Sequence, residues 1–131
     1  MSGLTLQEMY DISQDWHDRH VGKGAPFSPE KGRDKLLKVI EEYGELVSVV
    51  MKRGEDAIIN DPAVRAALLE EFADVLGLLS DALLCYGVTD EEFSDAYRRK
   101  HRRNMDRDYS KERAVYLERT QKADFDFLSA A

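Results

Sequence analysis

The stretch LLKVIEEYGELVSVV, residues 36–50, decides the fold, because it combines two helical faces of opposite character. At about 100° per residue, apolar side chains fall on one side of this segment and carboxylates on the other. The apolar side consists of Leu36, Ile40, Tyr43, Val47 and Val50, and the acidic side of Glu41, Glu42 and Glu45. The stretch predicts a long amphipathic helix.

Helix start and stop signals divide the rest of the chain. Ser28 and Asp61 each stand before a proline, and Gly54 and Gly87 follow predicted helix ends. Thr5 and Thr89 each open a capping box. Helices are predicted at about 5–20, 29–53, 62–86, 89–107 and 110–121, and no strand alternation is present. We predict an all-α fold, an antiparallel helical bundle of four main helices. It forms a single domain over residues 1–121, followed by a C-terminal tail at 122–131.

Composition limits the class of protein. The chain has 131 residues, 43% of them hydrophobic and 34% charged, as expected of one globular domain. No apolar run approaches the roughly 18 residues of a membrane span, and the N-terminal residues do not have the pattern of a secretory signal. Cys85 is the one cysteine, which fits a reducing compartment. These features predict a cytoplasmic protein that does not contact a membrane.

The net charge of −7 argues against a nucleic-acid partner, but it is unevenly distributed. Between positions 98 and 107, six cations accompany one acid: Arg98, Arg99, Lys100, Arg102, Arg103, Arg107 and Asp106. Cations near a helix C-terminus offset the helix dipole, but that effect accounts for only one or two of them. We therefore expect part of this basic strip to bind phosphate.

A second acidic group lies in the helix predicted at 62–86. Glu71 falls within the apolar stripe of that helix, and Asp74 lies at its edge. For Glu71 alone, a salt bridge and a metal role both remain open, since a buried bare charge is costly. The short connection at residues 54–61 makes the two long helices antiparallel, so both acidic groups lie roughly 12–18 Å from the same end. Carboxylates at one level favour a hard divalent cation such as Mg²⁺.

These residues form an EExxE pattern at 41–45 and an ExxD pattern at 71–74. The pair resembles the MazG-like all-α nucleoside triphosphate pyrophosphohydrolases over roughly residues 29–109. The resemblance implies Glu42, Glu45, Glu71 and Asp74 as Mg²⁺ ligands, with Mn²⁺ as a substitute ion. It implies that Glu41 is catalytic, as a further ligand or as the group that orients or deprotonates the attacking water. Such enzymes cleave a nucleoside triphosphate between the α- and β-phosphates to give NMP and pyrophosphate, one role being house-cleaning of the nucleotide pool.

The resemblance extends to substrate binding and assembly. Lys100 and Asn104 match a KxxxN element, in which Lys neutralises phosphate and Asn holds a sugar or base; Arg103 lies on an adjoining helix face. The N-terminal segment of such enzymes contributes to the base pocket, which makes Trp16 a candidate for stacking. The family also implies a homodimer or homotetramer.

Two alternatives are open. Phosphoribosyl-ATP pyrophosphohydrolysis would use the same carboxylates, but the connection at 56–65 and the basic strip favour a free nucleoside triphosphate. A non-catalytic helical adaptor that binds a partner through the basic strip would leave Glu71 on an apolar stripe unexplained.

Overall fold

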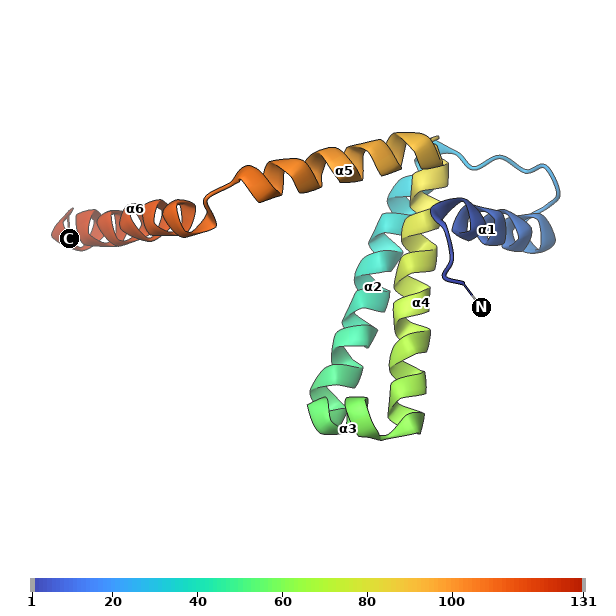
Figure 1. Ribbon diagram of the computed structural model, residues 1–131, viewed down its shortest axis with the longest axis horizontal. Coiled ribbons are helices and arrows are strands. Elements are labelled where there is room, and N and C mark those ends of the chain that lie inside the picture. Colours follow the sequence, from blue (N-terminus) through green and yellow to red (C-terminus); the bar gives the residue numbers. More distant parts are fainter. Residues whose placement is uncertain (1, 131) are drawn as a thin grey trace. The chain divides into compact units, whose positions relative to one another are not determined.

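The computed structural model describes residues 2–130, with side chains at residues 2–121, and every regular element in this part is a helix (Figure 1). The elements are α1 (Leu6–His20), α2 (Pro29–Arg53), α3 (Glu55–Asn60), α4 (Pro62–Cys85), α5 (Asp90–Asp106) and α6 (Tyr109–Ala130). The predicted all-α class is confirmed. The chain forms two compact units, Met1–Phe93 and Ser94–Ala131.

Local capping signals set most helix ends as predicted. Thr5 and Glu8 form the capping box of α1, and the Asp61 side chain accepts hydrogen bonds from the first backbone N–H groups of α4. Ser28 precedes α2, although its side chain makes no capping hydrogen bond. Gly54 ends α2 with a φ of 81°, a conformation that favours glycine.

Two segments differ from the sequence prediction. The connection at residues 54–61, predicted as a loop, contains the six-residue helix α3. The last helix, predicted to end near residue 121, continues to Ala130 in α6. The backbone of the predicted tail at 122–131 is thus helical as far as residue 130, whereas its side chains and residue 131 lie outside the described residues.

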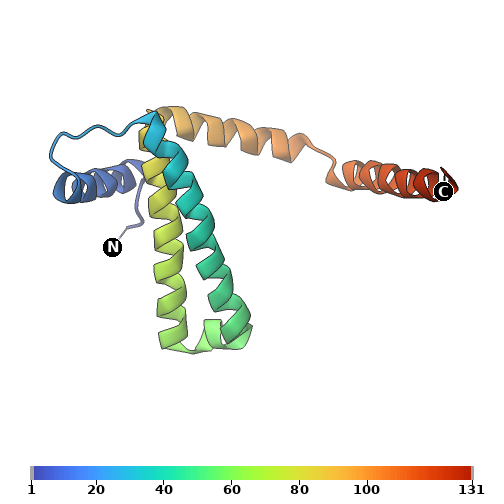
Figure 2. The ribbon, with the colours of Figure 1, turned by 180° about the vertical axis from the view of Figure 1, so that it is seen from behind.

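The centre of the first unit is an antiparallel hairpin of α2 and α4, joined at one end by α3 (Figures 1 and 2). Leu46 of α2 and Leu68 and Ala82 of α4 are buried, each less than 10% exposed. Glu42 of α2 lies one turn before Leu46, on the same helix face. The α2 face that meets α4 is thus centred on Leu46 rather than on the predicted apolar stripe.

Helix α1 packs against α4 through buried polar groups as well as apolar ones. The Tyr10 hydroxyl donates to the backbone carbonyl of Val88 at 2.9 Å, and the Ser13 hydroxyl donates to the Ser80 hydroxyl at 3.3 Å. These bonds attach one side of α1 to the end of α4 and to the turn that follows it. Trp16, one turn beyond Ser13, remains 52% exposed.

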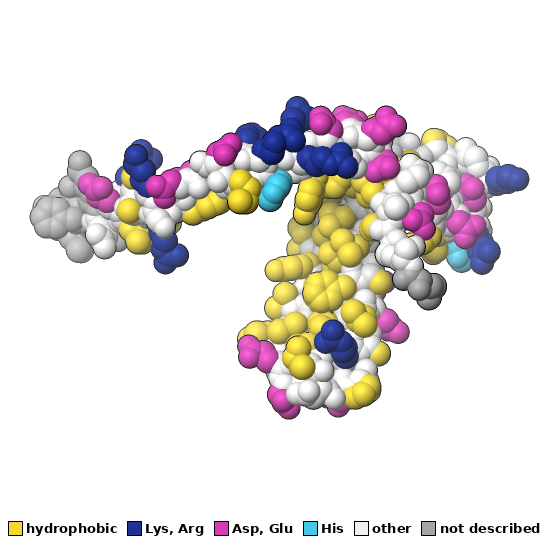
Figure 3. Space-filling model, viewed as in Figure 1, with side chains coloured by type: hydrophobic (Ala, Val, Ile, Leu, Met, Phe, Trp, Pro, Cys, Tyr) yellow, Lys and Arg dark blue, Asp and Glu magenta, His cyan; other side chains and the backbone are white. Residues whose placement is uncertain are grey.

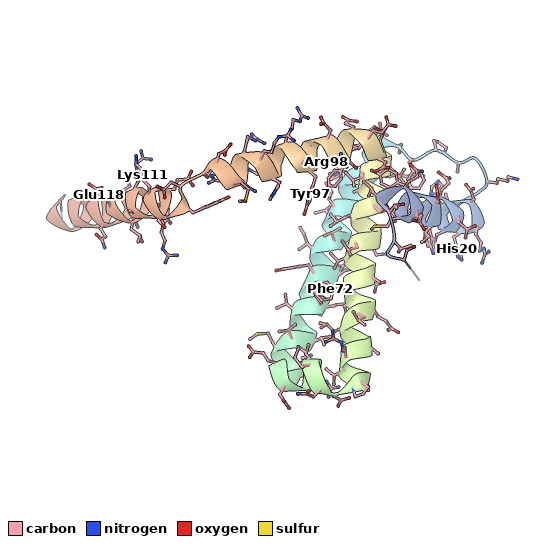
Figure 4. All side chains as sticks on the ribbon, in the orientation of Figure 1. His20, Phe72, Tyr97, Arg98, Lys111 and Glu118 are labelled. Carbon is pink, nitrogen blue, oxygen red and sulfur yellow. The ribbon has the colours of Figure 1, made fainter. Side chains whose placement is uncertain are left out.

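One face of the hairpin is apolar and exposed. Figure 3 shows hydrophobic side chains over α2 and α4 on the side turned to the viewer, and Figure 4 labels Phe72 there. On each helix, the exposed apolar residues lie one position after the residues that pack between α2 and α4, which is a rotation of about 100°. Because the two helices are antiparallel, this rotation brings both apolar stripes to the same face of the hairpin. We call them the apolar face: Leu36, Ile40, Tyr43, Val47 and Val50 of α2 with Leu69, Phe72, Leu76 and Leu79 of α4, all 37% exposed or more.

The second unit contains most of α5 and all of α6. Arg107, between the two helices, forms an ion pair with Glu112 at 2.6 Å and lies 4.6 Å from the ring centroid of Tyr109. The guanidinium beside Glu112 lowers the pKa of that carboxyl. These contacts lie at the junction that precedes α6 and at its first turn.

Among the described residues, no single helix is long and apolar enough to cross a membrane.

Candidate functional site

Three carboxylates from two helices form a cluster in the first unit. Glu42 and Glu45 lie on α2 and Glu71 lies on α4. One carboxylate oxygen from each lies within 4.8 Å of those of the other two. The antiparallel hairpin brings residues about thirty positions apart to the same level, as the short connection predicted. We call these residues the carboxylate cluster.

Charge repulsion and partial burial both act on the carboxylate cluster. The pKa of Glu71 is raised, chiefly because the carboxyl is removed from water and then because Glu45 and Asp74 are negative. The pKa of Glu42 is raised for the same leading reason, followed by the charge of Glu45. One Glu71 oxygen, Oε2, is buried and has no hydrogen-bond partner among the described residues. The cluster therefore holds negative charge that the folded chain leaves uncompensated.

The two remaining predicted carboxylates, Asp74 and Glu41, are not members of this cluster. Asp74, one turn after Glu71 on α4, acts electrostatically on both Glu42 and Glu71 but is not one of the three clustered groups. Glu41 is exposed on α2 and is also outside the cluster. The structure thus brings together three of the five predicted acidic residues and places Asp74 beside them.

The donor set of the carboxylate cluster fits a hard divalent cation. All three groups offer oxygen, and Mg²⁺ is typically held by one or two carboxylates together with substrate phosphates. In the part of the chain with described side chains, no Lys or Arg forms an ion pair with any of the three. The unpartnered Glu71 Oε2 has the lone pairs that a cation would take. A zinc site would call for His or Cys, which the cluster lacks.

A cleft of about 370 Å³ adjoins the cluster, bounded by α1, α2 and α4. Asp74 lines it, as does Trp16 of α1, which the sequence analysis selected as a candidate for stacking. Sequence reasoning missed four further polar residues in the cleft, Ser13, Lys35, Lys38 and Asp81. The spacing of two of them held a signal, because each lies seven residues, or two helical turns, from a predicted metal ligand: Lys35 from Glu42, and Asp81 from Asp74.

The predicted phosphate-binding residues lie on α5, in the second unit. Lys100 and Arg103 are exposed, and Arg103 lines a shallow hollow on α5 with Arg99 and Arg102. Asn104 is partly buried, and its side-chain oxygen Oδ1 is buried without a hydrogen-bond partner among the described residues. Lys100 and Asn104 are one turn apart, so they share a helix face as predicted.

Comparisons with models of protein families, with curated proteins and with solved structures find no match to this chain.

Proposed function

We propose that the chain is a Mg²⁺-dependent nucleoside triphosphate pyrophosphohydrolase, which cleaves between the α- and β-phosphates to give a nucleoside monophosphate and pyrophosphate. The observation that carries the proposal is the carboxylate cluster, three groups within 4.8 Å of one another with a buried, unpartnered oxygen on Glu71. Carboxylates this close repel one another, so a site of this kind is typical of cation binding rather than of structural stabilisation.

Glu42, Glu45 and Glu71 would hold Mg²⁺, with Asp74, which lines the cleft, as a further ligand. When bound, Mg²⁺ supplies positive charge that offsets the phosphates and favours attack by water at the α-phosphorus. Glu41 is exposed at the adjacent position of α2, where it can orient an attacking water or accept its proton.

Three residues of α5 have the chemistry to bind substrate groups. Lys100 and Arg103 are exposed cations that can offset phosphate charge, and Asn104 has an unpaired side-chain oxygen that can accept a hydrogen bond from sugar or base. Trp16 would stack on the base, since its side chain is half exposed and lines the same cleft as Asp74.

The decisive experiment is pyrophosphate release with Mg²⁺ across canonical and modified nucleoside triphosphates, with phosphoribosyl-ATP as a separate arm. We expect hydrolysis of free nucleoside triphosphates. We expect Glu45→Gln and Asp74→Asn to abolish it while helix content by circular dichroism stays near that of the parent chain. Glu70→Gln on α4 is the matched control, because Glu70 is exposed and lies outside the cluster. Full activity in either site variant would contradict the assignment.

We also propose that the apolar face binds a second copy of the chain. The face extends along two antiparallel helices, and packing it on its own equivalent would form a four-helix core, the usual arrangement for helical hairpins. Glu45, Asp74 and Asp81 are rotated to the opposite side of the same two helices, so a dimer of this kind leaves the carboxylate cluster and the cleft accessible.

A further inference from the structure

The cleft beside the carboxylate cluster contains an ion pair that the proposed reaction does not use. Lys35 of α2 and Asp81 of α4 approach each other to 3.4 Å, with side chains 26% and 17% exposed. Both residues line the cleft. A charge-assisted hydrogen bond is normally 2.7–2.9 Å, so this one is long. The two groups therefore keep much of their hydrogen-bonding capacity for a third partner.

The position of this pair suits a nucleoside whose phosphates lie at the carboxylate cluster. Lys35 precedes Glu42 by seven residues on α2, and Asp81 follows Asp74 by seven on α4. Because the helices are antiparallel, both steps run toward the same end of the hairpin, each about 10 Å long. That separation is comparable to the length of an extended nucleoside. This step of the argument rests on the proposed function, which places the phosphates at the cluster.

Trp16 supplies an aromatic surface next to the pair. The Lys35 ammonium lies 5.5 Å from the centre of the Trp16 ring, near the outer limit of a cation–π contact. The His20 ring also lies near Trp16, with ring centroids 4.8 Å apart, and Trp16 is still 52% exposed, so part of its ring is accessible to another planar group. A base placed against Trp16 would direct its hydrogen-bonding edge toward Lys35 and Asp81.

The chemistry of the pair discriminates among bases. An ionised carboxylate only accepts hydrogen bonds, and an ammonium only donates them. Guanine presents two adjacent N–H donors, at N1 and N2, beside the O6 acceptor, so both Asp81 oxygens and the Lys35 ammonium find partners. Adenine and cytosine place a ring-nitrogen acceptor next to a single amino group, and uracil flanks its one donor with two carbonyls. Each of these leaves an Asp81 oxygen facing a lone pair.

We propose that the cleft is the nucleoside subsite and that Asp81, supported by Lys35, makes it selective for guanine. Trp16 is the one tryptophan in the chain, so its fluorescence reports directly on a base that stacks there. The cleft lies wholly in the first unit, and the test requires neither metal nor turnover.

The experiment titrates the full chain, in EDTA, with GMP, IMP, AMP, CMP and UMP while Trp16 fluorescence is recorded. IMP is the critical comparison because its base, hypoxanthine, differs from the guanine of GMP only in lacking the N2 amino group. We expect GMP to quench with a dissociation constant at least about tenfold below that of IMP, as one carboxylate hydrogen bond requires. Equal quenching by GMP and IMP, or no quenching by any nucleotide, would overturn the proposal.

The variant Asp81→Asn tests the assigned residue. Its amide replaces one acceptor with a donor, so we expect GMP binding to weaken at least about tenfold while AMP binding changes little. Asp95→Asn is the matched control, since Asp95 also pairs with a basic side chain, Arg99 at 3.2 Å, but lies outside the cleft. Unchanged GMP binding in Asp81→Asn with parental helix content would overturn the assignment.

The two proposals can fail separately. Guanine-selective quenching without pyrophosphate release leaves the base-reading pair standing and removes the hydrolase. Pyrophosphate release with no preference for guanine, and with quenching equal for all bases, keeps the hydrolase and removes the selectivity of Asp81.

Discussion

Truncation of Ile40 should weaken self-association of the chain by about two orders of magnitude. Ile40 lies on the apolar face and is 68% exposed, so its removal takes little from the packing of the hairpin itself. Ile40→Ala deletes three carbons, worth about 2.4 kcal/mol when fully buried. If a second copy covers the exposed part, the loss is about 1.6 kcal/mol per chain and about 3 kcal/mol per dimer. The dissociation constant then rises about 200-fold.

Sedimentation velocity over a concentration series measures this change. The matched control is Ile59→Ala on α3, because Ile59 is 66% exposed but lies outside the apolar face. The control should sediment like the parent chain, whereas Ile40→Ala should shift toward monomer at the same concentration. A parent chain that is monomeric throughout, or equal shifts for the two variants, would refute the argument that the apolar face is covered by a second copy.

Three further predictions concern stability. Because the pKa values of Glu42 and Glu71 are raised above about 4.5 on folding, the folded chain holds protons that the unfolded chain has lost. The metal-free free energy of unfolding should then fall as pH rises through those raised values, with a shallower slope in Glu71→Gln melts. Mg²⁺ at about 100 times its dissociation constant should add about 2.7 kcal/mol at neutral pH, and this gain should disappear in Glu45→Gln. Leu46→Ala should cost about 2–5 kcal/mol in denaturant unfolding, because Leu46 is 6% exposed, whereas the exposed Leu37→Ala should cost under about 0.5 kcal/mol.

Helix boundaries could be predicted because their causes are local. The Thr5 capping box and the Asp61 cap act within one turn, and a proline fixes the first position of both α2 and α4. Helix α3 was missed because six residues carry too little periodicity to be distinguished from a loop, and its N-terminus follows Gly54 without a side-chain cap.

The packing partner of each helix face could not be predicted in the same way. Residues 36–50 show where the apolar and acidic sides lie, but not which side meets another helix of the same chain. In the structure, the α2 face centred on Leu46 meets α4, while Ile40 and Tyr43 are left exposed. An apolar stripe indicates that a helix face is to be buried, but the surface that covers it can belong either to the same chain or to a second molecule.

The meeting of the carboxylates could be predicted from the sequence. In two antiparallel helices with a short connection, the number of residues from the connection gives the position of each side chain along the helix axis. Glu42, Glu45 and Glu71 meet as the short connection required. The cleft did not follow, because Trp16, Lys35 and Asp81 come from three helices whose lateral arrangement depends on buried contacts such as that between Ser13 and Ser80.

The carboxylate cluster also depends on how α2 and α4 are aligned along their length. A helical hairpin can slip by one turn and still match many apolar side chains, and such a slip moves one helix about 5.4 Å past the other. That displacement exceeds the 4.8 Å within which the three ligand oxygens lie, so Glu71 would leave the reach of Glu42 and Glu45. A cation that needs all three carboxylates therefore binds one alignment of the hairpin only, and its presence during folding would select that alignment over its slipped neighbours.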